Sequence, residues 1–482
     1  MPGPLNVLWI QTDELRADAL GCYGHSRWPK GLTPNLDALA ARGVLFTNTF
    51  CNSPVCVSSR SSLLTGRYPH EIGVFHNEAV NKDHFQRLGL TTFPQVFAQA
   101  GYETVNAGKI HTPRNATWQC NLPLPKYDNP FLSRVVRQGC APEQMVCLAG
   151  TPFLVVGGVL DSEQTPTVEL TDTAIEWLQS KRDGAVPWLF RVSYEAPHTP
   201  VIAPRRFFEK FDPRDFKFDS QFDITTDLNG PLEQFIAEAN KSDEIDPQDI
   251  AFARACYWAV VAHLDEQIGR LLDCLDALDL TTRTIIVFDS DHGTLLGEQG
   301  SWQKQQFHRA AHRVPQIISC PGVLPENVQR DDLNDLLDRA PTLMKLCGIS
   351  RPSQFRGRDL FADAQSPKDR TTFGIIGYGE LNSYLYPLIK CGPPTPRRAC
   401  VRTRQWRYDV SVRWKGRDLF PGNPDYAPCL INSANDPEER INLSGRAEYA
   451  AVESHMASLL EGFLSLPVYS SAYCTTGGNP CS

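Results

Sequence analysis

The residues Asn6-Val7-Leu8-Trp9-Ile10 form a short, unbroken apolar run that ends directly in the polar residues Gln11-Thr12-Asp13-Glu14. Residues 188–192 and 284–288 are apolar runs of the same kind, also followed by polar clusters. Such runs are typical of strands that are buried on both faces of a parallel sheet. Segments with helical patterns lie between them. We therefore expect an α/β fold, with a mixed, mostly parallel sheet sandwiched by helices and ligands at the carboxyl ends of its strands.

The helices expected between these strands have recognisable ends. One begins at Thr33-Pro34, with a capping residue before a proline at the first helical position, and closes at Gly43. Residues 92–100 form a second helix that ends at Gly101. Residues 253–280 carry apolar residues at helical spacing and form the longest helix that we expect.

The pattern changes after about residue 370, which predicts a second, smaller unit. Residues 401–412 alternate as an antiparallel strand does, and residues 447–464 have the pattern of a final helix. We therefore expect a catalytic domain over 1–370 and an α+β subdomain with antiparallel strands and a helix over 371–469. Residues 470–482 are small and polar, which indicates a loose tail.

The composition excludes several classes of protein. Hydrophobic residues make up 41% and charged residues 21% of the 482 residues, which excludes disordered and collagen-like chains. The formal charge of −8 offers no basic surface for nucleic acid or anionic lipid. The apolar runs are much shorter than the roughly 20 residues of a membrane span. Because the start, Met1-Pro2-Gly3-Pro4, lacks the features of a secretory leader, we expect a cytoplasmic protein without nucleic-acid or membrane partners.

Two acidic clusters follow predicted strands. Asp13-Glu14 comes after the first strand, and Asp289-Ser290-Asp291-His292-Gly293 comes after the strand at 284–288. Carboxylates and an imidazole at neighbouring strand ends suit a divalent cation. The alternatives are an acidic pair that starts a helix beside Arg16 and an ordinary loop, and two clusters at one sheet edge favour the metal site.

A third cluster contains Cys56 and Arg60, followed by residues 61–67. A cysteine at a helix start with an arginine four residues later lies in a positive field that favours an anion. The alternative is a buried structural thiol.

These segments together resemble the signature of the type I sulfatases of the alkaline phosphatase superfamily. The matching motifs run in order from about residue 5 to residue 465, and comprise 6–13, 21–24, 33–37, 56–67, 101–104, 108–111, 196–200, 290–293, 313–315, 436–439 and Asn442-Leu443.

The resemblance implies a role for each matching residue. Cys56 becomes formylglycine, whose hydrated form attacks sulfur. Asp13, Glu14, Asp291 and His292, with an oxygen of the modified residue 56, hold one divalent metal ion, with calcium as the first expectation. Arg60 holds the nucleophile, Lys109 and Lys304 neutralise the sulfuryl oxygens, and His111 orients or deprotonates the nucleophile. His198 donates a proton to the leaving group, and Asn77 contacts the substrate.

Two residues depart from the family pattern. Ser58 stands where the maturation signal has proline or alanine, so conversion by the formylglycine-generating enzyme becomes an open point. Glu14 replaces a second aspartate, which leaves the metal open. Related phosphonate monoester and phosphodiester hydrolases also vary at this position, and manganese or zinc is expected if the chain is one of them. Lys109 and His111 favour a sulfatase, because those relatives carry uncharged residues there. A catalytically inactive, anion-binding relative is a third alternative.

The organic part of the substrate is not readable from the sequence. We expect residues 112–165, 204–248 and 374–404 to recognise it, because they lie between the motifs. The expected partners are a small-molecule sulfate ester and, during maturation, the formylglycine-generating enzyme.

Overall fold

The computed structural model describes residues 3–24, 27–77, 83–112, 118–122, 145–148, 154–181, 184, 186–219, 244–362, 370–377, 397–415, 418–421 and 428–466. None of the helices in these ranges has both the length and the apolar character that a membrane crossing requires.

A large mixed sheet forms the centre of the described structure. Its strand order is β13-β2-β12-β9-β1-β7-β3-β4, with β14 also paired to β2. The strands are β1 (Asn6–Asp13), β2 (Val44–Phe50), β3 (Glu103–Gly108), β4 (Cys120–Asn121), β7 (Trp188–Pro197), β9 (Thr284–Ser290), β12 (Arg313–Ser319), β13 (Val328–Arg330) and β14 (Asn334–Asp335). Only β12 runs antiparallel to its neighbours, β2 and β9, in the described sheet. The expectation of a mixed, mostly parallel sheet is confirmed.

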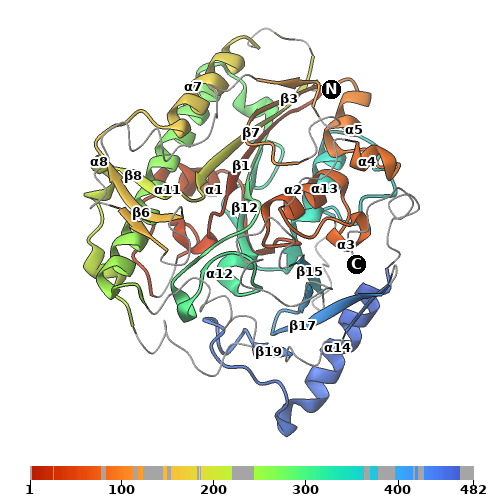
Figure 1. Cartoon of the computed structure of the whole chain (residues 1–482). Coiled ribbons are helices and arrows are strands. Elements are labelled where there is room, and N and C mark those ends of the chain that lie inside the picture. Colours follow the sequence, from red (N-terminus) through yellow and green to blue (C-terminus); the bar gives the residue numbers. More distant parts are fainter. Residues whose placement is uncertain are drawn as a thin grey trace.

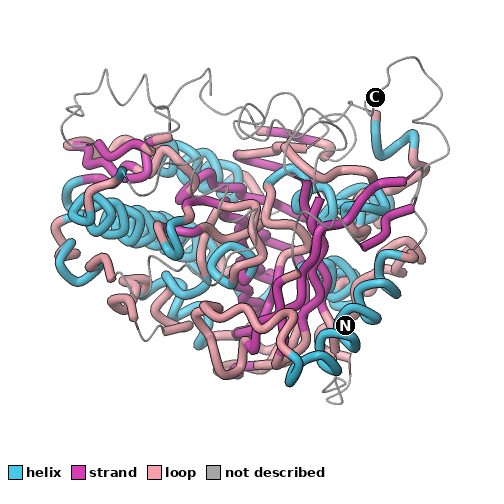
Figure 2. Tube along the Cα trace, turned by 60° about the horizontal axis from the view of Figure 1, so that its bottom comes forward, coloured by secondary structure: helices cyan, strands magenta, loops and turns pink. Residues whose placement is uncertain are grey.

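Helices cover both faces of the central strands, with α1 (Pro34–Ala41), α7 (Pro166–Gln179) and α11 (Pro247–Ala277) on one side and α2 (Cys56–Thr65), α5 (Phe93–Gln99) and α13 (Arg339–Leu346) on the other (Figure 1). Leu8 and Ile10 pack with α1, α7 and α11. Val7 and Trp9 pack with α2, α5 and α13. In Figure 2 the strands run between helical segments. Because both faces are covered, every residue of β1 is buried, which explains its unbroken apolar run.

Short elements complete the catalytic part of the chain. The helices are α3 (Pro69–Ile72), α4 (His84–Arg87), α8 (Arg205–Phe208) and α12 (Arg309–His312), with the 3₁₀ turns η1 (Ala17–Ala19), η3 (Pro213–Phe216), η5 (Thr281–Arg283), η6 (Glu298–Gly300) and η7 (Leu336–Asp338). Two small sheets join β5 (Met145–Cys147), β6 (Val155–Leu160) and β8 (Ile202–Pro204), and β10 (Leu295–Leu296) with β11 (Trp302–Gln303).

A separate antiparallel sheet follows near the carboxyl end. It contains β15 (Thr372–Gly377), β16 (Arg397–Arg402), β17 (Trp406–Lys415), β18 (Asp418–Pro421) and β19 (Cys429–Asn432). After η8 (Ala447–Tyr449), α14 (Ala450–Leu464) packs its apolar side on this sheet. The expected α+β subdomain is confirmed, whereas its boundaries at 371 and 469 stay predictions. The predicted tail, 470–482, lies outside the described residues.

Three local expectations were wrong in detail. Residues 401–412 are two strands, because Thr403 and Trp406 close a tight turn between β16 and β17. The long helix begins earlier, at Pro247, because Asp246 caps it by accepting a hydrogen bond from the Gln248 amide. Thr33 does not cap α1 with its side chain. The carboxylate of Asp265 instead accepts hydrogen bonds from the first amides of that helix, a contact across 230 residues.

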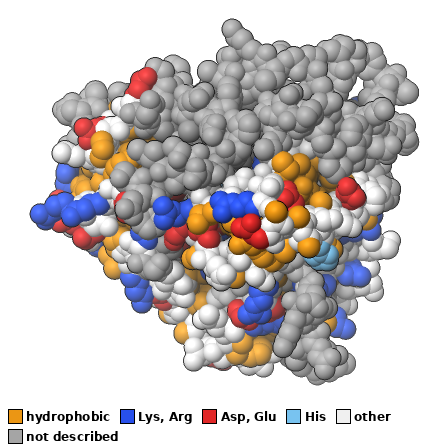
Figure 3. All heavy atoms as spheres, turned by 90° about the horizontal axis from the view of Figure 1, so that it is seen from below, with side chains coloured by type: hydrophobic (Ala, Val, Ile, Leu, Met, Phe, Trp, Pro, Cys, Tyr) orange, Lys and Arg blue, Asp and Glu red, His pale blue; other side chains and the backbone are white. Residues whose placement is uncertain are grey.

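Figure 3 shows one face of the molecule, on which the described basic, acidic and apolar side chains are interspersed.

Candidate active site

Three polar segments meet at the carboxyl edge of the large sheet. Asp13 ends β1 and Glu14 follows it, while Asp291 and His292 follow β9, which pairs with β1 in parallel. β7 pairs with the other side of β1 and leads to His198. Parallel strands that pair directly end at one edge of the sheet, so their following residues are neighbours in space.

The start of α2 brings Cys56 to the same edge. Cys56 is the first residue of this helix, and its side chain is buried. Val55 provides no side-chain cap, and Asn77 supplies one from outside, since its Oδ1 accepts a hydrogen bond of 3.0 Å from the Val57 amide. The first amides of the helix place a partial positive charge beside the sulfur, which favours an anion at position 56.

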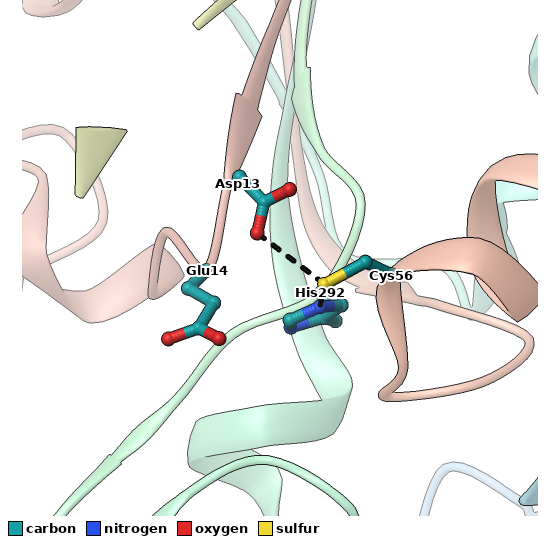
Figure 4. A group of neighbouring side chains, drawn as sticks. All are labelled: Asp13, Glu14, Cys56 and His292. Atoms are coloured by element: carbon teal, nitrogen blue, oxygen red, sulfur yellow. Dashed lines mark hydrogen bonds between the residues drawn. The ribbon is translucent and has the colours of Figure 1, made fainter. Parts of the chain in front are cut away.

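Four buried side chains surround one space (Figure 4). One donor atom from each of Asp13, Glu14, Cys56 and His292 lies within 4.8 Å of the other three. The Cys56 Sγ is 3.2 Å from the His292 Nε2 and 3.6 Å from the Asp13 Oδ1. The His292 Nδ1 contacts the Gly293 carbonyl oxygen at 2.8 Å, which directs Nε2 into the group. Two carboxylates, an imidazole and a sulfur can together hold one divalent ion.

Asp291, the fifth residue expected to bind the metal, is held by Arg60. The Arg60 Nε is 2.7 Å from the Asp291 Oδ2, and its Nη2 is 2.9 Å from the Asp13 Oδ2. All three side chains are buried. The guanidinium thus fixes two of the carboxylates expected at the metal site, and its role in holding the nucleophile stays a prediction.

Two lysines place positive charge beside this group. The Lys304 Nζ is 2.9 Å from the Cys56 Sγ, and it also pairs with the Glu14 carboxylate. The Lys109 Nζ is 3.0 Å from the Asp13 Oδ2. Burial acts to lower the pKa of both lysines, but the neighbouring negative charges outweigh it and raise each pKa above its usual value. Both side chains therefore stay cationic at neutral pH.

These contacts give Cys56 an unusual acidity. Burial acts to raise the pKa of its thiol, but the charges of Lys304 and His292 lower it well below the usual range of cysteine. Cys51 is also buried only five residues earlier, and burial raises its pKa well above that range. The difference between the two cysteines marks residue 56 as the position built for a negative charge.

Two further histidines face the sulfur, and their charges differ. His111, whose backbone is left-handed with φ of 44°, and His198 both act to lower the pKa of Cys56. Burial lowers the pKa of His111, which keeps its ring neutral. Burial acts in the same direction on His198, but the charge of Glu14 outweighs it and raises the His198 pKa. One ring can thus accept a proton while the other donates one.

Sequence reasoning missed Glu195 and a recess beside Glu14. Glu195 follows β7's buried residues at the sheet edge, with its carboxylate 3.5 Å from the Lys109 Nζ. Its position in the sequence, three residues before His198, could have identified it as a candidate site residue. The recess is lined by Glu14, Thr199, Trp302 and Gln303 among others, which come from separate segments and share no sequence signal. Much of 112–165, 204–248 and 374–404, the segments expected to recognise the substrate, lies outside the described residues.

Comparison with known proteins agrees with this geometry. The family model described as Sulfatase matches residues 5–349 of the chain. Human iduronate 2-sulfatase is 29% identical over 396 residues, which cover 72% of this chain and 70% of that protein. The ulvan-active sulfatase of Formosa agariphila is 28% identical over 483 residues, with 95% of this chain and 81% of the relative covered. The solved phosphonate monoester hydrolase of Agrobacterium radiobacter superimposes with a TM-score of 0.75 at 22% identity, over 95% of each chain, and shares the fold.

Proposed function

Because the chain belongs to the sulfatase family and is therefore an enzyme of the sulfuric ester hydrolase type, we propose that it hydrolyses a sulfate ester to an alcohol and inorganic sulfate. The observation that carries the proposal is the setting of Cys56. Its side-chain atom lies at the start of α2 and contacts both Lys304, at 2.9 Å, and His292, at 3.2 Å. A group at this position is buried and lies beside the side chains of Lys304 and His292, a setting that favours a negatively charged nucleophile.

The nucleophile in this proposal is formylglycine made from Cys56, as the family resemblance implies. Its hydrate supplies the hydroxyl that attacks sulfur, and release of sulfate restores the aldehyde. Cys56 is fully buried, so the modifying enzyme acts before α2 folds. Ser58, where the family has proline or alanine, donates a hydrogen bond of 2.7 Å to the Val74 carbonyl oxygen in the folded chain. Ser58 thus has a structural use in the folded chain.

The cations of the site suit a sulfuryl group. Lys304 and Lys109 lie on two sides of the residue 56 position and are bound to Glu14 and Asp13. When a substrate enters, these ammonium groups can pair with the sulfate oxygens, on which negative charge is spread in the transition state. A sulfate monoester carries one negative charge, and two lysines with a metal ion match it.

The two histidines divide the proton transfers between them in this proposal. His111 is neutral and contacts residue 56, so it can take the proton of the attacking hydroxyl. His198 is more readily charged, and its Nε2 lies 3.1 Å from the Lys304 Nζ, on the leaving-group side of the site. It can donate the proton that the departing alkoxide needs.

The residues present fit a divalent ion. Asp13, Glu14, His292 and residue 56 would hold it, with Asp291 beside them. The ion would supply positive charge that makes the hydroxyl of residue 56 more acidic. Conversion of Cys56 replaces a sulfur donor by oxygen, so three of the four donors become oxygens, which favours calcium. The unconverted site keeps a thiolate and an imidazole, which favour zinc.

The test compares two ester classes on one preparation. The chain is co-produced with a formylglycine-generating enzyme and assayed on 4-nitrophenyl sulfate and on 4-nitrophenyl phenylphosphonate, with Cys56→Ala as the inactive control. We expect kcat/KM to be higher for the sulfate and to vanish in the control. A preference for the phosphonate would assign the chain to the phosphonate hydrolases, and turnover of neither would leave an inactive relative. Because two relatives are named for iduronate and ulvan, sulfated uronic-acid saccharides are the first natural substrates to try.

A further inference from the structure

The carboxyl-terminal motif Asp436-Pro437-Glu438-Glu439 lies far from the reacting atoms, yet it contacts the segment that carries Lys304. This segment, residues 297–312, contains η6, β11 and α12. We propose that Glu439 is a positioning residue for Lys304, through which the carboxyl-terminal subdomain sets the geometry of the active site. The activity measurements that test this inference rest on the proposed function, whereas a second measurement, hydrogen exchange, is independent of it.

The Glu439 carboxylate joins the carboxyl-terminal sheet to α12. It accepts hydrogen bonds of 2.6 Å from the Arg402 Nη1 on β16 and of 2.6 Å from the Arg407 Nη1 on β17. Its Oε2 also accepts a 2.8 Å hydrogen bond from the backbone amide of Arg309, the first residue of α12. The carboxylate is buried and charged, since the arginines hold its pKa well below the usual range against the effect of burial. The first amide of α12 is therefore bound to a carboxylate that the carboxyl-terminal sheet holds in place.

The backbone of the motif holds the same segment at both ends. The Gln299 Nε2 donates to the carbonyl oxygens of Glu439, at 3.1 Å, and Glu438, at 3.3 Å. The His308 Nε2 lies 3.2 Å from the same Glu438 oxygen. Residues 299 and 308 are thus tied to two adjacent peptide groups, and Lys304 lies midway between them.

The segment between these ties has a backbone that needs external support. Gln299, Gln303 and Gln305 have left-handed conformations, with φ of 56°, 68° and 74°. Non-glycine residues adopt this region at a cost of about 1 kcal/mol or more each. Backbone hydrogen bonds to this stretch are the two-residue pairing of β11 with β10, those from the Gly297 amide to the Ser301 oxygen and from the Ser301 amide to the Glu298 oxygen, and one from the Gln305 amide to the Pro54 oxygen. The Gln303 Nε2 also donates to the Thr199 Oγ1, and the Arg402 guanidinium of the carboxyl-terminal sheet donates to the Phe307 carbonyl oxygen. We infer that the ties to Glu438 and Glu439 maintain this strained course.

The position of Lys304 matters because its contacts are short. Its Nζ is 2.9 Å from the Cys56 Sγ and 3.1 Å from the His198 Nε2. A displacement of about 1 Å in such a group can lower a rate about 100-fold. Release of the segment from Glu439 should therefore lower kcat more than it lowers substrate binding.

The experiment compares Glu439→Gln with Asp409→Asn. Asp409 belongs to the same buried network, where it accepts hydrogen bonds from Arg407, at 2.7 Å, and from Arg398. Among the described residues it makes no hydrogen bond to 297–312, so it is a matched control for lost stability. We expect Glu439→Gln to lower kcat at least about tenfold, and Asp409→Asn to leave kcat within about twofold. In a chain that already carries Lys304→Met, adding Glu439→Gln should lower kcat no further.

Hydrogen exchange of the peptide 299–309 gives the readout without substrate. Glu439→Gln should speed exchange there and Asp409→Asn should not. If Glu439→Gln does not fold, Gln299→Asn removes one tie with a residue that accepts the left-handed backbone, and the same results are expected. Any one of three results would overturn the inference. These are equal kcat losses in Glu439→Gln and Asp409→Asn, a kcat loss from Glu439→Gln that is as large in the Lys304→Met chain as in the wild type, and unchanged hydrogen exchange in Glu439→Gln. If the wild-type chain turns over no sulfate ester, the proposed function fails, and the exchange comparison still decides the positioning role.

Discussion

Replacing Lys304 by methionine removes one charge and keeps most of the side-chain volume. The ammonium group lies 2.9 Å from the Cys56 Sγ, the atom that oxygen replaces on conversion, and it also contacts His198 and Glu14. At an effective dielectric constant of 20, a unit charge about 4 Å from a developing anion contributes about 4 kcal/mol. Loss of one such contact in enzymes lowers kcat by about 100-fold to 1,000-fold. We expect a loss of this size in Lys304→Met.

The assay is steady-state turnover of 4-nitrophenyl sulfate by the converted enzyme. Lys181→Met is the matched control, because Lys181 pairs with Glu103 at a partly exposed site on the far end of the sheet. Such a pair contributes about 1 kcal/mol or less to stability, and its loss should leave kcat unchanged. If Lys304→Met retains kcat within about threefold of the wild type, Lys304 does not stabilise the sulfuryl oxygens and the proposed charge arrangement is refuted.

Three other predictions address stability and the metal. Arg60→Met should lower the free energy of unfolding by about 3–5 kcal/mol, because it leaves the buried Asp291 carboxylate without its arginine and removes one of the two cations, Arg60 and Lys109, that pair with Asp13. In urea denaturation, Arg42→Met, at an exposed pair with Asp276, should lose about 1 kcal/mol or less. Burial lowers the pKa of His70 to about 4, and its ring nitrogens have no hydrogen-bond partner. This histidine therefore contributes stability above pH 6.5 that is lost as the pH falls towards 4, and the loss at pH 5 is about 2 kcal/mol. The drop in Tm from pH 7 to pH 5 should be smaller in His70→Phe than in the wild type, and an equal drop would contradict this. Calorimetric titration of the unconverted chain should show that zinc binds more tightly than calcium. Cys56→Ser should lose this preference for zinc, and Cys51→Ser should keep it. A preference for zinc that survives Cys56→Ser would exclude the sulfur as a ligand.

The layers of the fold could be predicted because they depend on local patterns. The apolar runs at 6–10, 188–192 and 284–288 are the cores of β1, β7 and β9, and the polar residues after them meet at one edge. Helix ends marked by proline and glycine were also readable. Local sequence patterns contain no information on contacts between residues that are far apart in the sequence. The capping of α1 by Asp265 is such a case.

The residues of the site could be predicted from the sequence, whereas the contacts among them were less predictable. The structure brings Asp13, Glu14, Cys56 and His292 together, while their roles stay predictions. The sequence could not show that Arg60 binds two carboxylates, since this depends on how α2 packs against β1 and β9. It also could not show the contacts of the carboxyl-terminal motif with residues 299, 308 and 309, because these residues are 130 to 140 positions away from the motif in the sequence.

The mass of the tryptic peptide 43–60, from protein made with the modifying enzyme, tests the central claim most directly. The peptide contains Cys51 and Cys56, so alkylation of the thiols before digestion gives an internal control. We predict one alkylated cysteine, at 51, and an aldehyde at 56 that makes the residue about 18 Da lighter than cysteine. A peptide that carries two alkylated cysteines in a preparation that turns over sulfate esters would contradict the proposed nucleophile.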